Sequence, residues 1–119
     1  MSKPVYPQIK WPQTGTTSGY FTTDGNQVVG FITPATIAST SITFNAAIST
    51  QIQPITWFPV ENSASSSITF TTKAATAQYI AFNADQVNQF SGVEAVQMVA
   101  SSSEVANSAF RLVLIPRQY

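Results

Sequence analysis

The sequence predicts an all-β protein: a single β-sandwich or jelly-roll-like domain of about seven to eight short strands that follows an extended N-terminal arm. Three observations predict this class. Short segments rich in β-branched and aromatic residues alternate apolar with polar positions. Turn-forming residues separate these segments at a spacing of roughly eight to twelve residues. The 119 residues suffice for one hydrophobic core, and the absence of Cys excludes disulfides.

The N-terminal segment, residues 1–19, differs in composition from the rest of the chain. It contains three Pro residues, two aromatic residues and the polar stretch "TGTTSG", which together are typical of an extended arm. Burial of Tyr and Trp side chains against a neighbouring protein is energetically favourable. We therefore divide the chain into an arm (1–19) and a sandwich domain (20–119), and expect the protein-contact residues of the arm to be Tyr6, Pro7, Trp11 and Pro12.

Turn residues and alternation define the first strands. Asp24 and Gly25 form a tight-turn signal. The β-branched segment 27–33 follows, and Pro34 ends it. Segment 39–49 alternates polar and apolar residues, which predicts a strand with one buried face.

A nearly repeated sequence occurs at 38–47 ("ASTSITFNAA") and 64–75 ("ASSSITFTTKAA"). The residues after each copy diverge, so a duplicated domain is not indicated. The shared alternation instead predicts two strands of one sandwich. Ile42, Phe44, Ile68 and Phe70 would then point into the core. The outward residues, Ser41, Thr43, Ser67 and Thr69, would form an uncharged, hydroxyl-rich face.

The C-terminal half contains further strand patterns and one helical pattern. Strands are expected at 54–60, 78–82 and 109–116. Segment 83–92 has a capping Asn83 or Asp85 and a terminating Gly92, which predicts a short helix. Segment 93–101 is also compatible with a helix, but its Val content favours a strand.

The composition argues against most catalytic chemistry. The chain has no His and no Cys, so the usual general base and the thiolate nucleophile are absent. Its five acidic residues, Asp24, Glu61, Asp85, Glu94 and Glu104, fall in or near predicted turns or strand ends, where solubility and turn formation explain them. We expect no enzymatic activity, no catalytic residues, no metal and no cofactor.

The scarcity of charge also limits the partners. Only 8% of residues are charged and the net charge is zero, whereas charged residues make up about a quarter of a typical domain. So few charges cannot form a nucleic-acid groove. No apolar run approaches the length of a membrane span, and no signal peptide is visible at the N-terminus. We expect a complete small protein that is made and kept in a cytosol, with neither nucleic acid nor membrane as a partner.

Trp57 is the candidate exposed aromatic binding residue. It lies beside Phe58 in "ITWFPV". If Phe58 points inward, the two-residue period of a strand directs Trp57 outward, where Trp can stack on a sugar. The alternative is that Trp57 belongs to the core and Phe58 lies under a loop.

The order of several segments resembles small β-sandwich structural proteins of tailed bacteriophages. "GFITPA" precedes "SITF" and "WFPV", and then come "QYIAFNADQVNQFSGVEAVQMVASS" and "NSAFRLVLIPR". The resemblance covers about residues 28–115. The chain departs from the pattern after "SITFNAAIS", where many such proteins have an Asp-Gly turn and this chain has "TQIQP".

The resemblance implies a virion structural protein without catalytic residues. The favoured function is a capsid cement or decoration protein that binds and stabilises the outer shell. Its partner would be the major capsid protein, and it would itself form a homo-oligomer, with a trimer favoured. It would be made in the host cytoplasm and end on the capsid surface. The alternative is a tail- or fibre-associated module that recognises host-surface carbohydrate through Trp57.

Overall fold

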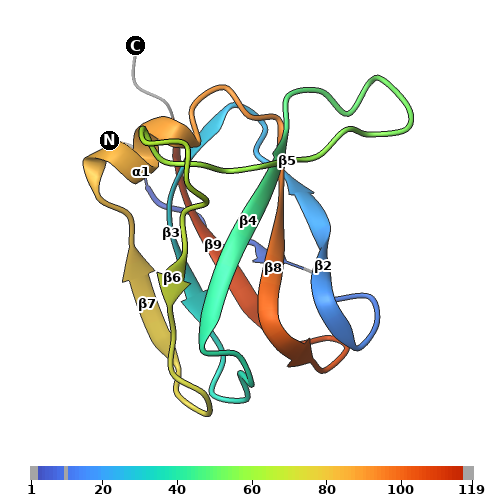
Figure 1. Ribbon diagram of the computed structural model, residues 1–119, viewed down its shortest axis with the longest axis vertical. Coiled ribbons are helices and arrows are strands. Elements are labelled where there is room, and N and C mark those ends of the chain that lie inside the picture. Colours follow the sequence, from blue (N-terminus) through green and yellow to red (C-terminus); the bar gives the residue numbers. More distant parts are fainter. Residues whose placement is uncertain (1–2, 10, 117–119) are drawn as a thin grey trace.

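The structure is a computed structural model that describes residues 3–9 and 11–116. Two antiparallel sheets pack face to face, which confirms the predicted β-sandwich (Figure 1). One sheet has the strand order β1-β9-β3-β7, and the other has the order β2-β8-β4-β5 with β6 paired to β4. The strands are β1 (Gln8–Ile9), β2 (Gly15–Thr22), β3 (Asn26–Thr33), β4 (Ser41–Ala47), β5 (Phe58–Pro59), β6 (Phe70–Thr71), β7 (Gln78–Ala81), β8 (Ala95–Glu104) and β9 (Phe110–Pro116).

The turn between β2 and β3 forms where the Asp-Gly signal predicts it. Asp24 and Gly25 have positive φ angles of 51° and 78°, as a type I′ turn requires. The Asn26 N–H donates to the Thr23 carbonyl at 2.9 Å and closes the turn. Strand β3 then ends at Thr33, directly before Pro34, as expected.

The two "SITF" copies lie side by side, because β4 and β6 are antiparallel partners in which Ile42 is opposite Phe70. The Ile and Phe residues of both copies are buried in the core, as predicted. The second copy contributes a much shorter strand than expected, as does segment 54–60. In β5 the reason is Pro59, which has no N–H to continue a ladder.

An aromatic cluster fills the centre of the sandwich. Its ring centroids lie between 4.7 and 6.3 Å apart, mostly in edge-to-face contacts. Such contacts stabilise a core beyond the effect of burial alone. The cluster takes rings from both sheets and from the helical segment: Phe31, Phe44, Phe70, Phe82 and Phe90.

The predicted helix is α1 (Ala84–Gln89). Asn83 caps it, because its side chain accepts from the Gln86 N–H and the Gln86 side chain accepts from the Asn83 N–H in return. Beyond the helix, Gly92 has a φ of 78° and redirects the chain toward β8. Of the two interpretations of segment 93–101, the strand is confirmed. In the described part of the chain, no helix is long and apolar enough to span a membrane.

The N-terminal residues are incorporated in the sandwich, which differs from the expected arm. Strand β1 pairs with β9, and β2 pairs with β8. The expected boundary at residue 19 falls inside β2. Ile9, in β1, and Trp11, shortly after it, are fully buried in the core between the sheets. Residues 8–9 and 15–19 therefore lie in strands of the two sheets, within the segment that the sequence predicts as an arm.

Gly30 is required where β3 meets β7. A Cβ atom at this position would lie 2.6 Å from the Ile80 carbonyl oxygen, a backbone atom that cannot move alone. We predict that Gly30→Ala lowers the free energy of unfolding by about 1–3 kcal/mol, as measured by urea denaturation. The matched control is Gly15→Ala, where a Cβ meets nothing within 4 Å. Equal stability of the two variants would contradict the prediction.

Candidate interaction surfaces

Two of the acidic residues hold loops in place. Glu94 accepts hydrogen bonds from the Thr50 N–H at 2.6 Å and from the Thr50 hydroxyl at 3.0 Å. These bonds fix the loop between β4 and β5, which projects from the body of the sandwich (Figure 1). Glu94 thus has a structural role that its position at a predicted strand end does not reveal.

Glu104 is a buried carboxylate, which corrects the expectation of a solvated turn residue. Only 1% of its surface is exposed. It accepts from the backbone N–H groups of Ala38 and Ser39 at 2.9–3.1 Å and from the Ser39 hydroxyl at 2.6 Å. These donors compensate the cost of burying a carboxylate. Glu104 therefore anchors the segment before β4 rather than forming a reactive site.

The remaining acidic residues lie apart from one another in the fold. Asp24 belongs to the β2–β3 turn, and Asp85 lies in the first turn of α1. Within residues 3–9 and 11–116, no three Asp or Glu side chains gather as they would to hold a metal ion. The absence of enzymatic activity stays a prediction.

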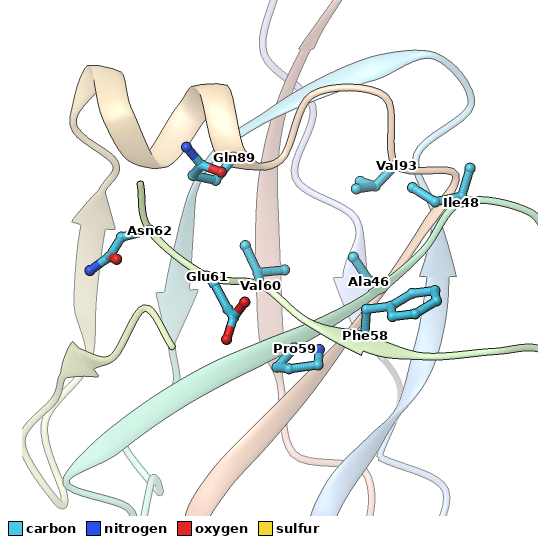
Figure 2. Close-up of a pocket in the computed structure, with 9 residues that line it drawn as sticks. All are labelled: Ala46, Ile48, Phe58, Pro59, Val60, Glu61, Asn62, Gln89 and Val93. Carbon is cyan, nitrogen blue, oxygen red and sulfur yellow. The ribbon is translucent and has the colours of Figure 1, made fainter. Parts of the chain in front are cut away.

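A hollow of about 420 Å³ lies between α1, β5 and the segment before β8. Figure 2 shows Gln89 and Val93 on one side of it, with Phe58, Pro59 and Glu61 on the other. The side-chain oxygen of the neighbouring Asn62 is already hydrogen-bonded, because it accepts from two N–H groups of its own turn. The hollow therefore offers one carboxylate and one amide among apolar walls, and does not assemble a reactive group.

The outer face of the four-stranded sheet is largely apolar, with the exposed Arg111 beside Ile32 at its border. In β9, Leu112 and Leu114 point into the core, so the alternating Val113 and Ile115 point outward. A groove of about 510 Å³ runs over this face. Tyr6 and Tyr79 are about half exposed there, at 48% and 59%. We call this surface the apolar sheet face; it consists of Pro4, Tyr6, Val29, Ile32, Tyr79, Val113 and Ile115.

The outer face of the five-stranded sheet is polar and carries an aromatic pair. Tyr20, Gln97 and Asn45 are successive partners across β2, β8 and β4, so their side chains share one face. The Asn45 amide Nδ2 donates to Gln97 Oε1 at 3.2 Å. The ring centroids of Tyr20 and Trp57 are 5.7 Å apart.

The predicted contact residues differ in their exposure to solvent. Tyr6 and Pro12 are exposed and Pro7 is half-buried. Trp11 is fully buried and stacks on Phe110, which corrects the expectation that it contacts another protein. Trp57 lies at the surface and is half-buried.

Several surface residues were not predicted from the sequence. Tyr79 occurs in a segment that was expected only as a short strand, and its alternation with Ile80 was the available signal. Tyr20, Asn45 and Gln97 come from three separate strands. Only the sheet register brings them beside Trp57, so no local pattern could have grouped them.

The comparisons with known proteins assign no relative to this chain. No protein-family model matches it, and no curated protein or solved structure is significantly similar to it.

Proposed function

We propose that this protein is a virion structural subunit, a capsid cement or decoration protein that binds the outer shell and stabilises it. The observation that carries the proposal is the apolar sheet face. A contiguous apolar surface on a small protein usually marks a site of protein contact. None of the seven residues that line the groove is charged, and one cation, Arg111, lies beside Ile32 on the same side of the sheet and donates to the Tyr6 carbonyl at 2.8 Å. The face therefore suits a partner surface that is mainly apolar.

The rest of the surface supports a structural role. Ser side chains predominate in exposed stretches such as 63–67 and 101–103, and the chain has no net charge. With little electrostatic repulsion between copies, many subunits can sit close together on a lattice. A subunit that binds only the assembled shell stabilises that shell by mass action, and contacts repeated over a lattice strengthen one another.

The copy number in purified particles tests this function. Mass spectrometry with a labelled standard would count the chain in particles of the virus that encodes it. Hundreds of copies per particle support a decoration protein. A handful of copies per particle would instead indicate a tail or fibre protein. Absence of the chain from particles would contradict a virion role altogether.

A charge placed on the apolar sheet face should impair shell binding. We predict that Tyr79→Glu weakens binding to shells that lack the protein by tenfold or more, about the effect of losing a central contact residue. Co-sedimentation of purified chain with such shells measures this. Val105→Glu is the matched control, since Val105 is also exposed, at 65%, but lies outside the face. Wild-type binding by Tyr79→Glu would show that the shell contact lies elsewhere.

A further inference from the structure

We propose that the outer face of the five-stranded sheet binds a neutral carbohydrate. The site is formed by Tyr20, Trp57, Asn45 and Gln97, which we call the aromatic–amide corner. It lies on the opposite side of the sandwich from the apolar sheet face, and the proposal does not rest on the capsid assignment.

The contact between Tyr20 and Trp57 shapes this corner. Strands β2 and β5 are at opposite edges of the sheet, yet the two rings meet with centroids 5.7 Å apart and planes tilted by 53°. The segment that leads into β5 must therefore cross the outer face of the sheet. It encloses one end of that face, where the outward-facing Ala47 and Ala95 are fully buried. Trp57 forms a wall beside a polar floor.

The aromatic pair supplies an apolar surface of suitable size. Tyr20 is 50% exposed, and the contact of its ring with Trp57 limits the freedom of the ring to move. The faces of aromatic rings carry partial negative charge, which attracts the weakly positive C–H groups on one side of a pyranose ring. Preorganised rings of this kind bind with little loss of conformational entropy.

The amides supply the hydrogen bonds that a sugar needs. A side-chain amide has two N–H donors and a carbonyl acceptor, and hydroxyl groups also both donate and accept. Asn45 and Gln97 orient each other through their mutual bond at 3.2 Å, and the Gln97 Nε2 also donates to the Ser18 carbonyl at 3.4 Å. Both amides keep further donors and acceptors for a ligand. Thr43 and Val99, a half-buried cross-strand pair, continue the floor along the sheet.

The charge of the corner defines the ligand class. None of its four residues carries a charge, so it has no cation to pair with a uronic or sialic acid. A neutral hexose chain fits this chemistry, and an acidic one does not. Because the site lies on the open surface of a sheet, we expect a dissociation constant of about 1 mM for a single protein molecule and the sugar. Repeated copies of the protein in an assembly would raise the apparent affinity.

NMR titration of the full-length ¹⁵N-labelled protein tests the proposal. The probes are maltohexaose, cellohexaose and N-acetylchitohexaose, with an oligogalacturonate of similar length as the acidic comparison. We expect at least one neutral probe to shift the Trp57 indole N–H and the side-chain amides of Asn45 and Gln97. The Trp11 indole N–H should not move, because it is buried and donates to the Gly15 carbonyl at 2.9 Å. It is an internal control for non-specific effects.

Two variants complete the test. Tyr20→Ala should raise the dissociation constant by about tenfold, the effect of losing one stacked ring. Tyr79→Ala removes a Tyr of similar exposure, 59%, from the opposite sheet and should leave sugar binding unchanged. Unshifted cross-peaks elsewhere in each spectrum establish that the variant is folded. The proposal is overturned if no neutral probe shifts these resonances, if Tyr20→Ala binds like the wild type, or if the acidic probe binds as well as the neutral ones. A loss of sugar binding with normal shell binding, or the reverse, separates this proposal from the capsid function.

Discussion

Replacing Trp11 with Ala should destabilise the protein by about 3–5 kcal/mol, the usual cost of truncating a large buried aromatic residue. Trp11 is 0% exposed, and its ring stacks on Phe110 with the centroids 4.9 Å apart. The substitution leaves a cavity beside Phe110 and removes the indole hydrogen bond to Gly15. Calorimetry should record a decrease in Tm of roughly 10–25 °C.

The conservative variant Trp11→Phe separates the two contributions. It keeps a ring against Phe110 but loses the hydrogen bond to the Gly15 carbonyl, so we expect an intermediate loss of about 1–2 kcal/mol. Tyr6→Ala is the control for an exposed aromatic residue of the same segment, and its effect should stay within about 0.5 kcal/mol. A Trp11→Ala variant of unchanged Tm that no longer joins its assembly would restore the original contact hypothesis.

Removing the buried carboxylate of Glu104 should have an effect of similar size. Glu104→Ala is expected to lower the free energy of unfolding by about 3 kcal/mol, because it leaves two backbone N–H groups without their acceptor and removes the shorter bond of one hydroxyl, which keeps only the Ser102 carbonyl at 3.1 Å. Those donors belong to Ala38 and Ser39. Chemical denaturation measures the loss, and hydrogen exchange should show earlier opening of the segment before β4.

The isosteric variant tests whether the carboxylate itself matters. In Glu104→Gln, one oxygen is replaced by an NH₂ group that faces donors, so we expect a loss of about 1–3 kcal/mol despite the unchanged shape. Glu61→Gln makes the same chemical change at an exposed position and should change stability by less than about 0.5 kcal/mol. Equal effects at the two positions would show that Glu104 is not the anchor described above.

Much of the sandwich could be predicted because its core strands obey local rules. In β4, Ile42, Phe44 and Ala46 alternate with polar residues, and all three are buried. The Asp-Gly turn could be predicted because it depends only on the backbone preferences of two adjacent residues. The capping of α1 is likewise determined within four consecutive residues, Asn83 to Gln86.

The N-terminal segment was misjudged because its Pro residues obscured a strand pattern. Ile9 and Trp11 are two residues apart, the period of a β-strand, and both are buried. Strand β2 was missed because its first half is polar and its pairing with β8 is irregular between Thr17 and Tyr20. There the Ser18 hydroxyl accepts from the Met98 N–H at 2.9 Å, and so replaces a backbone partner.

The interaction surfaces were harder to predict than the strands. Predicting the apolar sheet face requires knowledge that β9 lies between β1 and β3, because this position turns the side of β9 that carries Arg111, Val113 and Ile115 away from the second sheet. The aromatic–amide corner depends on a loop that carries Trp57 across the sheet to Tyr20. Both features arise from pairing between distant segments, and no local pattern encodes them.

The chain's two Trp residues lie in contrasting environments, and this has a spectroscopic consequence. Trp11 is enclosed by the core, whereas Trp57 is half-buried at the surface. Fluorescence of a Trp57→Phe variant would therefore come from a shielded indole with blue-shifted emission and would report on unfolding. Fluorescence of a Trp11→Phe variant would come from an indole in contact with water, accessible to iodide, and would report on events at the outer surface. One protein thus carries separate optical probes for its stability and for its binding.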